Sequence, residues 1–287
     1  MGNAQSAGTQ ARCAAARGAF PRRAHGVRLR GCKWVKPKEQ VVHNPWFWLA
    51  AVAASVFVGL SKGGLPAVGL LGVPVLSQVI SPVTAAGLLL PVYVLSDMLG
   101  LVAYRHAFER RVLVTLLPGA TLGVALGWAT ARLVPEALVT GLVGLIGLAY
   151  AARLLLQPEV QGAARASAVL PGTFWGTITG FTSFVSHAGA APYQIYVIPQ
   201  RLPKTVYAGT TTIAFAYVNA IKLLPYWALG QFTPDNLRTA AWLTLPAGLA
   251  VWAGVRLVRV IPQVLFFRFV TWALALVSVK LLIDAFA

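Results

Sequence analysis

The sequence predicts an all-α membrane protein, and three observations lead to this fold class. Hydrophobic residues make up 57% of the chain, charged residues only 11%, and the mean hydropathy is +0.71. A soluble domain of ordinary composition has about 25% charged residues, so this chain needs lipid as its solvent. The chain also contains eight apolar stretches of roughly 20 residues, the length that crosses a bilayer as a helix. We therefore expect about eight transmembrane segments.

Short polar or proline-bearing turns separate the eight stretches. Each stretch is apolar at consecutive positions and rich in Ala, Leu and Gly, whereas the strands of a membrane barrel alternate in polarity over shorter segments. This pattern favours helices over barrel strands. The predicted helices cover residues 45–62, 82–104, 111–131, 136–156, 169–189, 205–228, 237–258 and 263–286.

Residues 1–44 form a basic tail that differs from the rest of the chain. Both cysteines, Cys13 and Cys32, lie in it, so no disulfide or thiolate metal site can organise the membrane part. We expect a disordered cytoplasmic tail or an upstream extension from a wrongly assigned start codon. The alternatives are an organelle transit peptide, N-myristoylation at Gly2, and attraction to anionic headgroups. Its basic residues are Arg12, Arg17, Arg22, Arg23, Arg28, Arg30, Lys33, Lys36 and Lys38.

Basic residues near the spans also indicate topology, because cytoplasmic loops of membrane proteins are enriched in Lys and Arg. The tail predicts a cytoplasmic N-terminus, and Arg105, Arg110 and Arg111 agree when eight spans are counted. In the second half the same counting places four basic residues outside: Arg201, Lys204, Arg256 and Arg259. The bias is therefore consistent only in the first half of the chain.

The first and second halves of the sequence resemble each other. This similarity predicts two homologous four-segment repeats, residues 45–157 and 169–287, joined by a linker loop at 158–168. When residues 59–156 are written above residues 180–283, proline, glycine and polar positions match in one order. The matched pairs include Asp97 with Asn219, Tyr104 with Tyr226, Pro118 with Pro246, Gly127 with Gly254, and Pro135 with Pro262.

Each repeat opens with a stretch interrupted by helix breakers, Gly59 to Pro66 in the first and Gly180 to Pro192 in the second. An interrupted helix at membrane depth must be buried in protein or line a watery cavity, because its free backbone groups cannot face hydrocarbon. Interrupted segments at corresponding positions of two halves indicate a transporter's substrate site. If each stretch enters and returns, the two halves are inverted, which would also account for the basic residues that simple counting misplaces.

Ionisable residues at or near the breaks are the candidates for chemistry, because such residues inside a membrane are costly. Asp97 is the candidate for proton or ion coupling. Three of these ionisable candidates also have a purely structural explanation. Lys62 could be a lysine that snorkels to the membrane surface, His187 a packing residue, and Asp97 a partner that neutralises Lys222. The candidate substrate-binding residues are Lys62, Gly63, Gly64, Ser186, His187, Gly189, Thr210, Asn219 and Lys222.

Enzyme chemistry finds no support in the sequence. It contains no HExxH, no Gly-x-Ser-x-Gly elbow and no P-loop, and its carboxylates are too few for a metal cluster. We therefore expect no catalytic residues, no metal and no cofactor. The expected partners are a small anion, the bilayer and a second copy of the chain as a homo-oligomer, with no nucleic acid.

Several of these motifs together resemble the sulfite exporter family TauE/SafE over residues 46–287. They are the repeat, the run from Ser186 to Tyr193, the run Ile198-Pro-Gln-Arg-Leu-Pro-Lys204, and Asn219 with Lys222. The sequence departs from the family's glycine-rich openings at Lys62-Gly-Gly-Leu-Pro66 and at Ser186-His-Ala-Gly189. The resemblance implies a multi-pass transporter, of the bacterial inner membrane in the first instance, for sulfite, an organosulfonate or a related sulfur-containing anion. It leaves the substrate open.

The leading functional hypothesis is a secondary transporter that exports this anion, with coupling to protons as an option through Asp97. Lys62, His187 and Lys222 would bind its charge near the middle of the membrane, and the glycines would admit it. The alternative is a non-transporting membrane scaffold or an assembly partner of an enzyme complex. Replacing Lys62 or His187 would leave cellular anion handling untouched in that case.

Overall fold

The computed structural model describes residues 45–286, apart from residues 81, 131, 132, 134, 157–163, 229–231 and 233. The basic tail and residues 158–163 of the predicted linker lie outside this part of the chain. The described residues form helices joined by short turns, with no strand among them.

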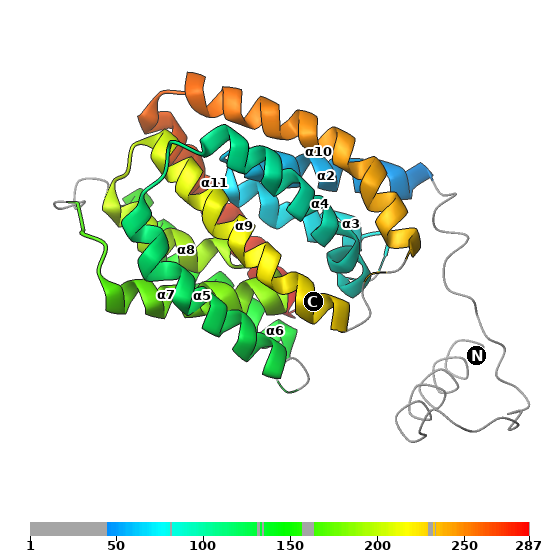
Figure 1. Cartoon of the computed structure of the whole chain (residues 1–287). Coiled ribbons are helices and arrows are strands. Elements are labelled where there is room, and N and C mark those ends of the chain that lie inside the picture. Colours follow the sequence, from blue (N-terminus) through cyan, green and yellow to red (C-terminus); the bar gives the residue numbers. More distant parts are fainter. Residues whose placement is uncertain are drawn as a thin grey trace, which may run out of the picture. The chain divides into compact units, whose positions relative to one another are not determined.

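A helix covers each of the eight predicted stretches, and short helices follow the two interrupted ones (Figure 1). Prolines lie inside four of the long helices, α4, α5, α9 and α10. The elements are α2 (Pro45–Lys62), η1 (Pro66–Leu71), α3 (Gly72–Ser77), α4 (Pro82–Tyr104), α5 (Arg110–Thr130), α6 (Glu136–Leu156), α7 (Val169–Ser186), α8 (Ala190–Val197), η3 (Ile198–Gln200), α9 (Lys204–Ala228), α10 (Pro234–Val260) and α11 (Gln263–Phe286).

Within the described residues, six helices are long and apolar enough to cross a membrane: α2, α4, α5, α6, α10 and α11. α9 is less apolar because it carries Lys204, three consecutive threonines, Asn219 and Lys222. Large apolar side chains are exposed on the outside of the bundle, among them Leu249 at 73% and Trp227 at 70%. Such surfaces suit lipid, and the chain is a multi-pass membrane protein.

Both interrupted stretches enter the bundle and turn back. After α2 ends, the chain returns beside it, so that Gly69 packs against Ser61 and Gly72 against Val58. In the second half, Gly189 packs against Ser183, and the Tyr196 hydroxyl donates a hydrogen bond to the Ala168 carbonyl, 3.3 Å away. The segments α2–η1–α3 and α7–α8–η3 are therefore helical hairpins.

The long helices of the two halves pack in matching pairs. α2 packs on α10 and α7 packs on α5, while α4 lies on α9 and α6 on α11. Glycines allow the closest approaches: a Cβ on Gly63 would meet the backbone of Gly254, and one on Gly123 would meet the Thr177 carbonyl. Exchanging the two halves turns the α2–α10 pair into the α7–α5 pair and leaves the α4–α9 and α6–α11 pairs as they are.

The hairpins also fix which ends of the helices lie together. α2 and α4 run in the same direction, because Lys62 meets Asp97 and the Gly63 carbonyl accepts a hydrogen bond from Tyr104. The end of α4 and the α4–α5 loop are therefore at the end of the bundle opposite to the start of α2 (Figure 1). Pro45 and Arg105 therefore do not lie on one side of the membrane, although counting eight spans had placed the start of the first span and Arg105 together on the cytoplasmic side.

The four basic residues that simple counting misplaced lie at the same end as Arg105. Lys204 donates to the carbonyls of Arg259 and Ile261, and Gly209 packs against the Ala107 carbonyl. Contacts between these loops gather the basic residues into one rim, which we call the basic end. It includes Arg105, Arg110, Arg111, Arg153, Arg165, Arg201, Lys204, Arg256 and Arg259.

Candidate functional site

A cavity lies where the two hairpins meet α4 and α9. Its volume is about 50 Å³. Both breaks contribute to it, since Lys62 ends α2 and His187 follows α7. The lining residues are Ser61, Lys62, Pro66, Gly69, Tyr93, Ser183, His187, Ala190, Thr211, Thr212, Phe215, Asn219 and Lys222.

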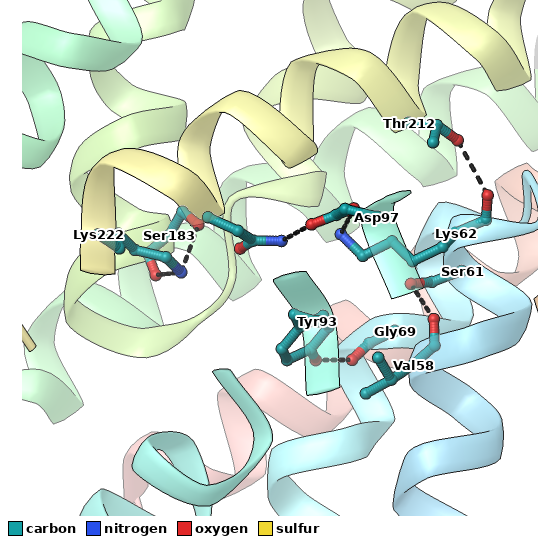
Figure 2. Close-up of polar contacts among 10 residues, drawn as sticks. Val58, Ser61, Lys62, Gly69, Tyr93, Asp97, Ser183, Thr212 and Lys222 are labelled. Atoms are coloured by element: carbon teal, nitrogen blue, oxygen red, sulfur yellow. Dashed lines mark hydrogen bonds and ion pairs between the residues drawn. The ribbon is translucent and has the colours of Figure 1, made fainter. Parts of the chain in front are cut away.

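Lys62 forms a buried ion pair at one side of the cavity. Its Nζ lies 2.8 Å from Asp97 Oδ1, and both side chains are almost fully buried, 5% and 1% exposed. Figure 2 shows this pair of Lys62 and Asp97, and the other carboxylate oxygen accepts a hydrogen bond from Asn219 at 2.8 Å. The structural alternative in which Asp97 neutralises Lys222 was therefore wrong, because the carboxylate pairs with Lys62.

Aromatic rings cover the Lys62 ammonium. Its Nζ is 5.1 Å from the centre of the Tyr93 ring and 5.9 Å from that of Phe215, within the range of cation–π attraction. The Tyr93 hydroxyl donates to the Gly69 carbonyl at 3.0 Å, so this tyrosine also holds the returning segment η1. Lys62 is thus fixed in place, and snorkelling to the membrane surface does not describe it.

Lys222 lies at the other side of the cavity with a different set of partners. Its Nζ donates to the carbonyl and the hydroxyl of Ser183, at 3.0 and 3.2 Å, and lies 3.5 Å from His187 Nδ1. The residue is 1% exposed. The ion pairs among the described residues are Lys62–Asp97 and Lys280–Asp284, so Lys222 has no carboxylate within 4.0 Å there.

His187 is held between two tyrosines at the second break. Its Nε2 is 2.9 Å from the Tyr226 hydroxyl, and its ring stacks on Tyr93 with centroids 6.4 Å apart and planes 10° from parallel. The backbone of His187 has φ 55°, a left-handed conformation that is uncommon outside glycine. Strain of this kind concentrates at functional sites, because the surroundings must over-determine it.

The charges in the cavity do not cancel. In formal charge, Lys62 and Lys222 face one carboxylate, Asp97, within the described residues, which leaves an excess of one positive charge. α8 also begins at Ala190 in the lining, and a helix N-terminus adds positive potential. Hydroxyl and amide donors surround this charge. The arrangement can bind a small anion.

Only some of the site residues predicted from the sequence line the cavity in the structure. Lys62, His187, Asn219 and Lys222 line the cavity, and Asp97 lies directly behind Lys62. Five others do not line it, although four of them shape the breaks. At the first break, the Gly63 carbonyl accepts a hydrogen bond from Tyr104, and Gly64 has a backbone φ of +109°. At the second break, the Ser186 hydroxyl donates to the Thr182 carbonyl, and Gly189 packs against Ser183. The fifth residue, Thr210, donates to the Val206 carbonyl and accepts from the Glu109 amide.

Sequence reasoning missed Ser61, Tyr93, Ser183 and Phe215 as lining residues, and of the three consecutive threonines it named only Thr210 as a substrate-binding candidate. Helical spacing was the available signal, because residues four apart share a face. Tyr93 lies four before Asp97, Ser183 four before His187, and Phe215 four before Asn219. On α9, Thr211 and Thr212 face the cavity while Thr210 points to the α4–α5 loop.

Two helical hairpins meeting at a buried, positively charged cavity define a class of protein, the multi-pass membrane transporters with interrupted helices. The model of the sulfite exporter TauE/SafE family matches residues 51–281. The chain belongs to this family, whose members are membrane transporters of sulfur-containing anions. The match confirms the resemblance found in the sequence. Searches among curated proteins and among solved structures gave no match.

Proposed function

We propose that this protein is a secondary transporter that exports a small inorganic sulfur oxyanion, with sulfite as the first candidate, through the cavity between the two hairpins. The observation that carries the proposal is Lys222. A buried ammonium costs several kcal/mol unless it is paired, and among the described residues no carboxylate lies within ion-pair distance of it. An anion in the cavity would supply the missing charge.

The size of the cavity favours a small anion. A water-sized group needs about 10–15 Å³ of such volume, so about 50 Å³ holds roughly four groups. Sulfite consists of one sulfur and three oxygens and is of this size. A taurine-type sulfonate carries a carbon chain and an amine in addition, so its binding would require the hairpins to move apart.

The donors around the cavity suit a tetrahedral or pyramidal oxyanion. Lys222 and Lys62 supply charge-assisted donors at two sides, and Thr211, Thr212 and Ser183 supply hydroxyls between them. The Thr212 hydroxyl now donates to the Lys62 carbonyl at 3.1 Å, which ties α9 to the first break. An anion that engages both lysines would also link the two hairpins.

Asp97 gives the site a means of coupling to protons. In the structure its carboxylate competes with any anion for Lys62. Protonation would release Lys62 to bind the anion, and loss of the proton would restore the ion pair and expel the anion. Proton movement and anion movement would then depend on each other.

The matching packing of the two halves supports the remaining part of the proposal. Each half begins with a hairpin that enters and returns and continues with three long helices, so each half would cross the membrane an odd number of times. The repeats would then be inverted, as in many secondary transporters. Rocking of one half against the other would expose the cavity to each side in turn.

Flux through proteoliposomes tests the proposal. The purified chain is reconstituted, and uptake of ³⁵S-labelled sulfite, sulfate and taurine is measured with and without a pH gradient. We expect saturable sulfite flux, accelerated by the gradient, and taurine flux at least tenfold lower. Protein that is folded by circular dichroism but moves none of the three anions would contradict the proposal and would favour a scaffold.

A further inference from the structure

Buried polar atoms without a hydrogen-bond partner gather around α8, next to the cavity. Both amide atoms of Gln194 and the hydroxyls of Tyr150, Tyr207 and Ser278 find no partner among the described residues. Gln194 and Tyr207 are 0% exposed. Each such atom costs about 1–3 kcal/mol when it is left unsatisfied, so apolar side chains would be cheaper here in a merely structural role.

These residues come from four helices that meet in one place. A Cβ on Gly147 of α6 would touch both Ala191 of α8 and Ser278 of α11. α6 and α8 run in the same direction, toward the basic end, and Tyr150 and Gln194 each lie one turn beyond this contact on their helices. Tyr207 of α9 is a near neighbour of Tyr150.

The cluster is joined to the cavity at one end. Thr211 lines the cavity, and its hydroxyl lies 3.0 Å from that of Tyr193. The Tyr193 and Tyr207 rings are 6.5 Å apart, and Tyr207 lies one helical turn before Thr211 on α9. Hydroxyl groups therefore continue from the cavity wall to Tyr207.

At the other end the cluster approaches exposed arginines. Tyr150 is a near neighbour of Arg165 and Arg153, and both arginines are exposed at the basic end. Arginines at the mouth of a passage raise the local concentration of anions. Neutral donors inside a passage hold an anion weakly enough to let it go, which conduction requires.

We propose that Tyr150, Gln194 and Tyr207 line a hydrated route along which the anion passes between the cavity and the basic end. The inference rests on the proposed function for the identity of the anion. It assigns to these residues a role in the rate of passage and none in the affinity of the cavity.

Tyrosine-to-phenylalanine variants separate this role from a structural one. Y150F and Y207F each remove a buried hydroxyl without a partner, so the melting temperature should stay equal or rise. We expect maximal sulfite flux to fall at least fivefold while the Kd for sulfite stays within twofold. Y217F is the matched control on α9, since its hydroxyl bonds Thr121 elsewhere, and should keep full flux. Unchanged flux in both Y150F and Y207F would overturn the route.

A second measurement does not depend on sulfite transport. In a background with Cys13→Ser and Cys32→Ser, Q194C is exposed to an anionic methanethiosulfonate that carries a sulfonate group. Labelling of Q194C is expected, and V277C, buried at 5% beside Ser278, should remain unlabelled. Labelling of Q194C in a protein that shows no sulfite flux would support the hydrated route and contradict the proposed sulfite transport. No labelling of folded Q194C would overturn the route.

Discussion

Lys62 and Asp97 meet at 2.8 Å in the interior of the bundle, where the end of one hairpin touches the middle of α4. Asn219 of α9 donates a hydrogen bond to the other oxygen of this carboxylate. Lys222, one turn beyond Asn219, is left to the second hairpin. The charge of Lys62 is therefore balanced by a carboxylate, whereas the charge of Lys222 is not. Most of the predictions below follow from this difference.

Breaking the buried ion pair from one side should destabilise the protein more than removing both partners. K62M leaves a buried carboxylate without its counter-charge, which costs about 3–5 kcal/mol. Adding D97L removes that carboxylate and should recover most of the lost stability. Thermal unfolding in detergent measures both variants. A double variant that is less stable than K62M would show that the pair is not the source of the loss.

Asp97 should determine the response to a pH gradient. D97N keeps the shape of the side chain and can still bond Asn219, but it cannot exchange a proton or form the ion pair. We expect sulfite flux to persist and its acceleration by the gradient to disappear. Flux assays of wild type and D97N at matched internal and external pH provide the baseline. Full acceleration in D97N would exclude Asp97 as the coupling residue.

Tyr226 should act on the anion through His187 and Lys222. Its hydroxyl lies 2.9 Å from His187 Nε2, and His187 in turn lies beside Lys222. Y226F removes one hydrogen bond, about 1 kcal/mol, which corresponds to a rise of roughly fivefold in KM. Y217F, on the same helix, serves as the control. An equal effect of both substitutions would point to general weakening of α9.

The contact between α2 and α10 should not tolerate a side chain at Gly63. A Cβ there would lie 2.7 Å from the backbone of Gly254 and from the Val251 carbonyl, so the helices would have to separate. We expect G63A to lower the melting temperature by several degrees and to reduce flux. G248A is the matched control, because its Cβ meets only a flexible Leu99 methyl at 3.2 Å.

Much of the fold could be predicted from the sequence, because apolar length and helix breakers are local signals. All eight helices begin and end within a few residues of the expected positions, and the breaks fall at Lys62 and His187. The direction of the chain after each break depends on long-range packing, such as Gly69 against Ser61. Counting spans without these returns misplaced Arg105 relative to Pro45.

The candidate site was predictable only where a residue type is unusual in a membrane. Lys62, His187, Asn219 and Lys222 stood out as polar groups in apolar stretches, and all four line the cavity. Serine, threonine and tyrosine are common in membrane helices, where they often bond their own backbone, as Thr210 does to Val206. Which threonine faces the cavity depends on the rotation of α9, and that is set by its neighbours.

Sulfite flux in a Lys222 variant tests the central claim most directly. K222M removes the unbalanced charge while keeping an unbranched, flexible side chain that is one atom shorter. K280M removes a lysine that is 39% exposed and paired with Asp284 on the surface. The account predicts that K222M loses at least 95% of sulfite flux and that K280M keeps it. Flux in folded K222M equal to that of the wild type would contradict the claim that this lysine binds the transported anion.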